Sequence, residues 1–504
     1  MTRLQTYLAE LQRFGIRPGL ERIQALLQSA GNPQSSYPII LVGGTNGKGS
    51  TCEFLSQMLC RDGLRVGLFT SPHLYQWNER IRVLQPHPAS VQLPAPHMST
   101  HVARELFAGA ISDHDLDALF DAAKPHLESV AAQHDQPTEF ETVTFLGLWH
   151  FARAAVDVAV VEVGLGGTWD ATNVCEPVVS VITHVALDHC DRLGDTVQAI
   201  ARDKAGIARA NRVLVTGETK PDVLQVLREE CDARHARLWP FRAPNYSNDR
   251  AAFEQATTRL SPDFIHPINS ASDNSASDKV QTEATRESNA GAPSFQRLNE
   301  ATAWVARAAW LECDPSTRSS SAANDLAPHE YSCGAPPQDS PALQVPGRAE
   351  TLRLEPRVLI DGANNPDGAA HLANYLRALL ESGAQGGDEK NEAASRLILV
   401  PGILEDKDWR AMIAVLAPLA HRVIATQSGS PRAARAGDIA EEARRYVSAV
   451  EIATPVSRAV ERALQLARVQ DIVCVCGSFY TVAEVSREAV QAWPRNLFVH
   501  SDNA

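Results

Sequence analysis

The chain has 504 residues, 44% of them hydrophobic, and carries a formal net charge of −13 with an isoelectric point near 5.7. This length exceeds what a single hydrophobic core supports, so the sequence predicts at least two domains. The acidic balance excludes a general nucleic-acid or membrane-surface binder, because such proteins need a basic face. No apolar stretch is as long as a membrane span, and residues 1–11 lack a signal-peptide core. We therefore expect a cytoplasmic protein.

Strand-like and helix-like segments alternate in the first half of the chain. Nearly continuous apolar strands separated by helical patterns indicate a largely parallel sheet with helices on both faces. The predicted strands are 39–42, 66–69, 158–163, 178–182 and 213–215, and the predicted helices are 52–60, 140–151 and 197–208.

The alternation breaks between about residues 261 and 346, where Ser, Asn, Asp, Ala and Pro dominate. We predict a low-complexity insertion at about 262–294 and a linker or insertion at 313–344. Both are expected to be disordered, because they hold too little apolar surface to form a core. One amphipathic helix is predicted between them, at 295–311.

A second alternating region follows, and the fold class predicted for the whole chain is α/β. Ligands of such sheets bind at the C-terminal ends of strands, so we expect the active site in a cleft between the two domains. The predicted strands are 357–361, 397–400, 422–425 and 472–475, and the predicted helices are 371–380, 409–416, 439–447 and 456–467.

Nine cysteines are scattered along the chain. Their odd number and the lack of a compartment signal indicate reduced thiols. Cys474 and Cys476 lie two residues apart in an apolar strand, which puts both on one face. We interpret them as small buried residues rather than metal ligands, because no partner pair has zinc spacing.

The most informative segment is 39–51, with the sequence IILVGGTNGKGST. A strand, a glycine-rich turn and the start of a helix in this order are typical of a loop that binds nucleotide phosphates. Lys48 would neutralise the β- and γ-phosphates, and Ser50 or Thr51 would hold Mg²⁺. In the standard loop a hydroxyl residue follows the lysine directly, whereas here Gly49 intervenes. An ordinary tight turn is the alternative.

Two further motifs place metal-binding groups after apolar strands. Glu162 ends one strand and is followed by three glycines at 164, 166 and 167, so it could bind Mg²⁺ or orient its water. His189 lies beside Asp188 and Asp191, an arrangement that suits a divalent ion. A surface glutamate and a satisfied polar histidine are the alternatives. His184 is nearer to its strand, and we do not expect it to be a ligand.

Other candidates are less specific by themselves. The polar turn 170–173 could contact substrate or cap a helix. Ser71 could reach a metal, and Arg80 and Arg82 could meet an anionic substrate, although surface arginines would look the same. Lys204 alone is indistinguishable from a lysine on a helix surface.

In the second region, Asp361 ends a strand and could accept a hydrogen bond from a ribose or cap the turn that follows it. Arg348 lies at the domain junction, where its guanidinium could follow a phosphate as the domains close. The turn at 477–481 could line the cleft or simply join a strand to a helix.

Taken together and in this order, the motifs resemble the folylpolyglutamate synthase/dihydrofolate synthase family of ATP-dependent Mur-type ligases. The resemblance runs from residue 14 to about residue 485, apart from the insertions. The resembling segments are 14–16, 19–23, 44–50, 71–74, 79–81, 138–141, 162–167, 170–173, 187–189, 204–207, 346–348, 361–366, 402–404, 406–408 and 477–481.

The resemblance implies an activity and a domain assignment. ATP would phosphorylate a substrate carboxylate, the amine of L-glutamate would attack the acyl phosphate, and phosphate would leave. Residues 1–312 would form a Mur-ligase-type ATP-binding domain with a P-loop and a mostly parallel sheet. Residues 345–504 would form a smaller, Rossmann-like glutamate-ligase domain.

The resemblance also implies roles for matching residues. The catalytic residues would be Lys48, Glu162, His189 and Lys204. ATP would contact Asn46, Gly47, Lys48, Gly49, Ser50, Asn299, Arg348 and Asp361. Two Mg²⁺ ions would be held by Ser71, Glu162, His189 and Lys204 as its carbamate, with Ser50 nearby. Thr138 and Phe140 would border the pterin or pteroate site, and Arg80 is the third substrate candidate. The chain departs from the family pattern at Asn364, Thr168 and Asp203, where histidine, arginine and glutamate are usual.

The leading hypothesis is a cytoplasmic, monomeric ligase that adds L-glutamate to tetrahydrofolate, with dihydropteroate as a second acceptor to be tested. Its partners would be small molecules only, with no nucleic acid and no membrane. The alternatives are a Mur ligase for cell-wall precursors, a P-loop kinase or regulatory nucleotide-binding protein, and a catalytically inactive homologue.

Overall fold

The computed structural model describes residues 2–11, 15, 17–87, 107–240, 294–313, 345–385 and 395–494. The chain divides into two compact units, of which the first comprises Met1–Pro72, Trp77–Ala95 and Ala108–Leu343, and the second His73–Gln76, Pro96–Phe107 and Gln344–Ala504. The insertion predicted at 262–294 and the linker predicted at 313–344 lie outside the described residues. The exceptions are Ser294 and Cys313, the first and last residues of one helix. Residues 14 and 16 of the first resembling segment also lie outside them.

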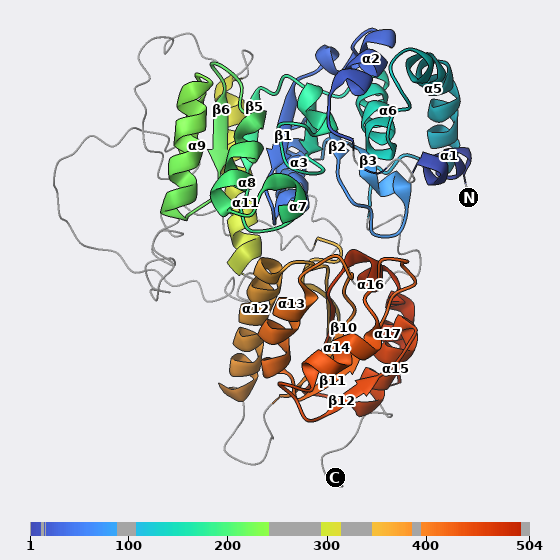
Figure 1. Ribbon diagram of the computed structural model, residues 1–504, viewed down its shortest axis with the longest axis vertical. Coiled ribbons are helices and arrows are strands. Elements are labelled where there is room, and N and C mark those ends of the chain that lie inside the picture. Colours follow the sequence, from blue (N-terminus) through green and yellow to red (C-terminus); the bar gives the residue numbers. More distant parts are fainter. Residues whose placement is uncertain are drawn as a thin grey trace, which may run out of the picture. The chain divides into compact units, whose positions relative to one another are not determined.

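The first unit is built on a seven-stranded sheet with the order β3-β2-β4-β1-β5-β6-β7 (Figure 1). Every neighbouring pair is parallel except β2 with β3. The strands are β1 (Ile39–Gly43), β2 (Val66–Phe69), β3 (Ile81–Leu84), β4 (Val158–Glu162), β5 (Val179–Ile182), β6 (Val213–Thr216) and β7 (Arg237–Pro240).

Helices cover both faces of this sheet, because its strands alternate their apolar side chains between two cores. Leu41 of β1 packs into one core, whereas Ile40 and Val42 pack into the other. The first core is covered by α1 (Arg3–Leu11), α2 (Glu21–Ser29), α5 (Asp113–Gln133), α6 (Glu139–Arg153), α8 (Val197–Lys204) and α9 (Pro221–Ala233). The second core is covered by α3 (Lys48–Arg61) and α11 (Ser294–Cys313).

The starts of two helices matter for the site. Helix α3 begins at Lys48, four residues before the predicted start, and its N-cap is Gly47 with φ 88°. Helix α6 begins with a capping box, in which the Thr138 hydroxyl accepts from the Glu141 N–H and the Glu141 carboxylate accepts from the Thr138 N–H. The short helix α7 (Cys190–Leu193) follows His189.

The second unit contains a six-stranded sheet with the order β12-β11-β10-β13-β9-β8. All its neighbouring pairs are parallel except β8 with β9. The strands are β8 (Glu350–Leu354), β9 (Arg357–Asp361), β10 (Leu397–Pro401), β11 (Arg422–Ala425), β12 (Val450–Ile452) and β13 (Ile472–Cys476). The α/β class with mostly parallel sheets is therefore confirmed.

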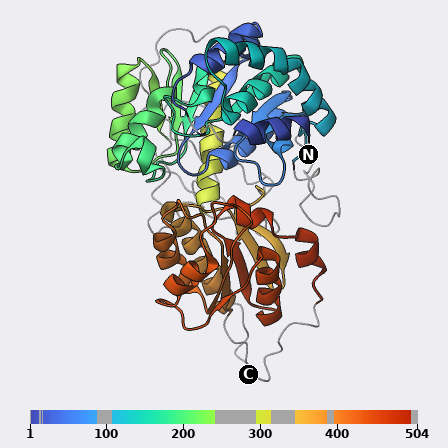
Figure 2. The ribbon, with the colours of Figure 1, turned by 45° about the vertical axis from the view of Figure 1, so that its right-hand side comes forward.

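This second sheet also lies between two layers of helices (Figure 2). A hydrophobic core lies on each face of this sheet, and Cys474 and Cys476 are buried in one of them, as predicted from their spacing. That core is covered by α12 (Pro366–Gln385), α13 (Trp409–Leu416) and α14 (Ala436–Ala443). The opposite core is covered by α15 (Val456–Leu466), α16 (Phe479–Ala483) and α17 (Arg487–Ala492). Among the described residues, no helix combines the length and the apolar composition needed to cross a bilayer.

The packing of α6 on β2 provides a test of the first unit's core, to which Phe151 belongs. A Cβ at Gly67 would lie 2.7–3.0 Å from three ring atoms of the buried Phe151. We expect Gly67→Ala to lower the free energy of unfolding by roughly 1–3 kcal/mol, because a rigid ring cannot make room for the methyl group. Urea unfolding measures this change.

Gly437 on α14 is the matched control, because nothing lies within 4 Å of a Cβ placed there. Gly437→Ala should leave stability unchanged or raise it by up to ~1 kcal/mol. Adding Phe151→Leu to Gly67→Ala should restore part of the loss. Equal stabilities of the two alanine variants would contradict this account of the β2–α6 packing.

Candidate active site

The candidate site lies at the carboxyl edge of the first sheet. Because β1, β2, β4 and β5 are mutually parallel, the loops that follow them leave the sheet on the same side. Val42 pairs with Glu162, and Gly43 pairs with Ile182. This register sets the glycine-rich loop between Glu162 and the segment that begins at Thr183.

The glycine-rich loop is closed on two sides by side chains that leave no room for a Cβ. Gly44 has φ 141°, and a Cβ there would lie 2.0 Å from the Thr183 hydroxyl oxygen. Gly47 has φ 88°, and a Cβ there would lie 2.2 Å from the Asn299 amide oxygen. Asn299 of α11, predicted as an ATP contact, therefore lies directly against the start of α3. Only glycine fits both positions.

Backbone and hydroxyl groups fix the middle of the loop. The Thr45 N–H donates to the His184 carbonyl over 2.6 Å, and Asn46 and His184 form an antiparallel bridge. The Thr45 hydroxyl bonds both the N–H and the carbonyl of Ala186 at 3.1 Å. The Thr183 hydroxyl donates to the Asn46 carbonyl at 2.7 Å. The loop thus has a short antiparallel partner in 183–186.

Two lysines converge on the carbonyl of Gly44. Lys48 Nζ donates to it over 3.2 Å and to the Thr45 carbonyl over 3.1 Å, while Lys204 Nζ donates to it over 3.0 Å. Lys204 is only 3% exposed. Burial and the nearby Lys48 charge lower the pKa of Lys204 to about 7, against the carboxylates of Asp203 and Asp188, which raise it. About half of this amine is therefore neutral at pH 7, whereas a lysine in water is almost fully protonated.

Glu162 ends β4 inside the same group of loops. It is 2% exposed, and its carboxylate accepts from the Ser71 N–H over 2.8 Å. A Cβ at Gly49 would lie 3.5 Å from the carboxylate, so the first turn of α3 faces Glu162. The structure thus brings together Ser71, Glu162 and the loop, as predicted, and Ser50 is buried in that same first turn of α3.

The glycine cluster after Glu162 is organised by Asp170. One Asp170 oxygen accepts from the Leu165 N–H at 2.8 Å, and the other from the N–H and hydroxyl of Thr172. Burial raises the pKa of the Asp170 carboxyl, although these hydrogen bonds lower it. Of the two predicted roles for the 170–173 turn, the cap is confirmed. The ring of Phe140 packs against Gly164, which places this predicted substrate residue beside the same loop.

His189 stands at the N-cap of α7 in the left-handed region, with φ 51° and ψ 41°. Its N–H donates to the Asp188 carboxylate at 2.9 Å, and its Nε2 lies 3.8 Å from the same oxygen. The Asp188 carboxylate also raises the pKa of Lys204.

Three predicted substrate groups have clear structural surroundings. Thr138 is buried in the capping box of α6. The guanidinium of Arg80 lies 4.2 Å from the ring centroid of Trp77. Arg82, in contrast, is buried and forms a bidentate ion pair with Glu53 of α3. Of the two alternatives given for Arg82, a surface arginine is wrong, because the side chain is buried, and its guanidinium is paired inside the first unit.

In the second unit, two buried carboxylates hold the loop that carries Arg348. Glu350 accepts from the Gly347 N–H, and Asp361 accepts from the Ala349 N–H, each over 2.7 Å. Arg348 itself stacks on the ring of Phe479, 4.2 Å from the centroid. Burial raises the pKa of Asp361, while the charge of Arg348 lowers it. Asp361 also accepts from the Ala363 N–H, so it caps the turn before α12.

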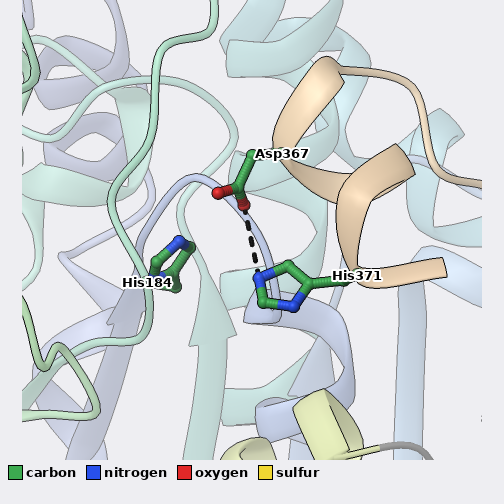
Figure 3. Close-up of side chains that lie close together, drawn as sticks. All are labelled: His184, Asp367 and His371. Carbon is green, nitrogen blue, oxygen red and sulfur yellow. Dashed lines mark ion pairs between the residues drawn. The ribbon is translucent and has the colours of Figure 1, made fainter. Parts of the chain in front are cut away.

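The first turns of α12 carry an ion pair (Figure 3). The Asp367 carboxylate lies 3.6 Å from His371 Nε2, one helical turn away. His184, which is drawn in the same view, belongs to the first unit. There its Nδ1 lies 3.3 Å from the fully buried Glu218 carboxylate. Asn365, beside the family departure at Asn364, accepts from the Gly368 N–H.

Sequence reasoning missed Glu218 and Glu350. Burial acts to raise the pKa of Glu218, but hydrogen bonds from His184 and from the N–H groups of Lys220 and Val185 outweigh it and lower the pKa to about 2. Glu350 forms a buried ion pair with Arg487 at 2.6 Å. In the sequence, Glu218 is a single glutamate after the strand predicted at 213–215, and Glu350 is a single glutamate just after Arg348. Neither residue belongs to a recognisable motif.

The arrangement in the first unit suits a bound polyphosphate. The N-terminus of α3 with Gly47 as its N-cap, and the ammonium of Lys48, favour an anion at the loop. The oxygen atoms of Glu162 and Ser71 and the imidazole of His189 suit a divalent cation beside it. The site can therefore bind a nucleotide with a metal ion next to a buried amine whose pKa is lowered to about 7.

Comparison with known proteins agrees with this geometry. Residues 347–479 match the family described as Mur ligase, glutamate ligase domain. The dihydrofolate synthase/folylpolyglutamate synthase of Bacillus subtilis is 32% identical over 431 residues, which cover 85% of each chain. A "Probable bifunctional folylpolyglutamate synthase/dihydropteroate synthase" of Haloferax volcanii is 34% identical over 480 residues. These cover 95% of this chain and 49% of the relative, so the chain spans about half of that protein's length.

Solved structures give the same relationship. Escherichia coli FolC in complex with DHPP and ADP has a TM-score of 0.69 and 26% identity, and the match covers 97% of this chain and 98% of that one. A bifunctional folylpolyglutamate synthase/dihydrofolate synthase with Mn, AMPPNP and L-glutamate bound has a TM-score of 0.67 and 26% identity, with the same coverage. On this identity and coverage, the chain belongs to the folylpolyglutamate synthase/dihydrofolate synthase family of Mur-type ligases, as its ordered motifs predicted.

Proposed function

We propose that this chain is an ATP-dependent ligase that adds L-glutamate to the carboxylate of tetrahydrofolate, with 7,8-dihydropteroate as a second acceptor. The observation that carries the proposal is the glycine-rich loop on which Lys48 and the buried Lys204 converge, beside Glu162. The names of the relatives support both activities. The ligands of the structural relatives, namely ADP with DHPP and AMPPNP with Mn and L-glutamate, support the substrates.

The nucleotide would bind with its phosphates on the loop. The backbone of Asn46, Gly47 and Gly49 and the hydroxyl of Ser50 would contact phosphate oxygens at the positive end of α3. Lys48 would turn its ammonium from the carbonyls of Gly44 and Thr45 to the β- and γ-phosphates. Asn299, which lies against Gly47, would contact the rest of ATP.

Mg²⁺, as two ions, fits the donor set at this edge of the sheet. Glu162 supplies a buried carboxylate already oriented by the Ser71 N–H, and Ser71, His189 and Ser50 supply further oxygen or nitrogen donors. When bound, the metal screens the charges of ATP and the substrate carboxylate and polarises the phosphoryl oxygens. Glu162 and His189 would therefore be catalytic together with the two lysines.

Lys204 would act as a carbamate. Its neutral amine adds carbon dioxide, forming an N–C bond and releasing one proton, which turns the neutral side chain into an anionic ligand for the metal. A lysine in water is almost fully protonated at neutral pH, so the lowered pKa of about 7 supports this role. The neighbouring Lys48 ammonium would favour the anion once it has formed.

In the second unit, Arg348 and Asp361 would contact ATP. The loop that carries Arg348 is held by buried carboxylates, and Asp361 is the last residue of β9. On the substrate side, Phe140 beside Gly164 would border the flat pterin ring, with Thr138 at the same helix start. Arg80 would pair with an anionic group of the substrate. Residues 1–312 would form the ATP-binding domain and residues 345–504 the glutamate-ligase domain.

The chemical step is an acyl transfer. The substrate carboxylate oxygen attacks the γ-phosphorus of ATP, and ADP leaves. The amine of L-glutamate then attacks the carbonyl carbon of the acyl phosphate, the C–N bond forms, the C–O bond to phosphate breaks, and the amine loses a proton to solvent. The protein's contribution is to orient both substrates and to keep water from the acyl phosphate.

We further propose that the protein is a cytoplasmic monomer with no nucleic-acid or membrane partner.

The function is tested by measuring phosphate release from ATP and Mg²⁺ with purified protein. Release should require L-glutamate together with tetrahydrofolate or dihydropteroate, and EDTA should abolish it, because metal removal leaves the phosphate charges unscreened. The acceptor that works decides between one activity and two. Release with cell-wall precursors instead, or glutamate-independent release, would overturn the proposal.

Lys48→Ala should reduce kcat/KM for ATP by at least ~100-fold, because it removes a charged donor to the transferred phosphate. The thermal unfolding midpoint should stay within a few degrees of that of the wild type. Lys124→Ala, which removes an exposed lysine of α5, is the control and should keep full activity. Normal turnover by Lys48→Ala would remove the phosphate-loop assignment.

Lys204→Arg keeps a positive charge but cannot form a carbamate, so we expect kcat to fall at least ~100-fold. With isotope-labelled bicarbonate and Mg²⁺, the wild type should show one carbamate signal by carbon NMR. That signal should grow as the pH rises through about 7, because the neutral amine then predominates. Lys124→Arg should retain both the signal and the activity. An active Lys204→Arg variant would refute the carbamate role.

A further inference from the structure

Glu218 lies in the turn after β6 and joins two strand ends. It is fully buried, and its two oxygens accept from three backbone N–H groups and contact one imidazole nitrogen. One oxygen accepts from the Val185 N–H at 2.9 Å and lies 3.3 Å from His184 Nδ1. The other accepts from the N–H groups of Thr219 and Lys220 at 2.8 and 3.0 Å. A single carboxylate thus fixes the end of β5 against the end of β6.

Lys220 adds a second connection between the same two turns. Its Nζ donates to the Val185 carbonyl over 2.9 Å and lies 3.4 Å from His184 Nε2. Nδ1 of the imidazole thus faces the Glu218 carboxylate, and Nε2 faces the Lys220 ammonium. His184 is therefore held from both ring nitrogens, by an anion on one side and a cation on the other.

The segment held in this way is the partner of the glycine-rich loop. The His184 carbonyl accepts from the Thr45 N–H at 2.6 Å, and the N–H and carbonyl of Ala186 bond the Thr45 hydroxyl. The Thr45 carbonyl in turn accepts from Lys48 Nζ. The hydrogen bonds therefore run without a gap from Glu218 through residues 184–186 to the loop and to Lys48.

We infer that Glu218, His184 and Lys220 are positioning residues for nucleotide binding, which set the shape of the glycine-rich loop from the neighbouring strand ends. This inference rests on the proposed function, since it assumes that the loop binds the phosphates. Glu218 and Lys220 reach the loop through Val185 and His184, and the backbone of 184–186 makes the contacts with Thr45. Their loss should therefore weaken nucleotide binding more than it slows the chemistry of the bound complex.

The test measures binding of ADP with Mg²⁺ to the full chain by calorimetry, with KM for ATP and kcat as a second readout. Glu218→Gln keeps the shape of the side chain but sets an amide NH₂ against backbone N–H donors. We expect Kd and KM to rise about tenfold, and kcat at saturating ATP to change by less than about twofold.

Asp471→Asn is the matched control, because Asp471 is also fully buried and is held by Arg468 and Arg396 in the second unit. It should lower the thermal midpoint and leave Kd unchanged. Equal losses of binding in Glu218→Gln and Asp471→Asn, or unchanged binding in a folded Glu218→Gln, would overturn the inference. A wild type that binds no ADP would instead overturn the proposed function, and this inference with it.

A pair of substitutions at His184 decides the matter if Glu218→Gln does not fold. His184→Asn places an amide N–H where Nδ1–H lies, so it should keep Kd within about twofold of that of the wild type. His184→Leu removes both ring contacts and should raise Kd about tenfold, and Lys220→Met should raise it about threefold. Wild-type binding by His184→Leu would contradict the positioning role.

Discussion

The candidate site depends on the parallel register of β1 with its two neighbours. The pairing of Val42 with Glu162 and of Gly43 with Ile182 sets three loops side by side, one strand spacing of about 4.8 Å apart. A shift of one residue would turn the Glu162 side chain to the opposite face of the sheet. Backbone hydrogen bonds inside the sheet, rather than contacts within the loops, therefore determine which side chains can meet.

The polar groups of this site are buried more deeply than is usual for charged residues. Lys204, Asp170 and Glu218 each lose most of their hydration, and each recovers it from backbone groups rather than from an opposite charge alone. Main-chain partners are fixed by the fold, so the side chains have little freedom to reorient. The same pattern recurs in the second unit at Asp361.

Sequence reasoning located the central strands and the loops that follow them, because both carry strong local signals. The strands predicted at 66–69, 357–361 and 422–425 agree with β2, β9 and β11 at both ends. The edge strands β3, β7, β8 and β12 were missed, since short strands at an edge lack a continuous apolar run. Helices α1, α2, α5 and α9 were not predicted either, although α5 spans 21 residues.

Within the site, the glycine-rich loop, Glu162 and Ser71 could be predicted because strand, turn and residue type coincide in the sequence. The position of Asn299 against Gly47 could not, since it depends on α11 packing on α3 from about 250 residues away. Lys204 acquired a role only through the family resemblance, and its burial is a tertiary property. Glu218 could not be predicted from its lone position after a strand, because the groups that bind it come from two separate turns.

Arg348 shows what an early ordering of a side chain does to ligand recognition. An arginine free in solvent loses about 2 kcal/mol of rotamer entropy when it is fixed. Arg348 stacks on Phe479, on a loop held by Glu350 and Asp361. In the nucleotide contact that we propose for Arg348, that entropy loss would therefore occur during folding of the second unit rather than during binding. The entropy of nucleotide binding measured by calorimetry should then be less unfavourable than the number of polar contacts suggests. A smaller side chain at position 479 would leave Arg348 less ordered before binding and make the binding entropy more unfavourable.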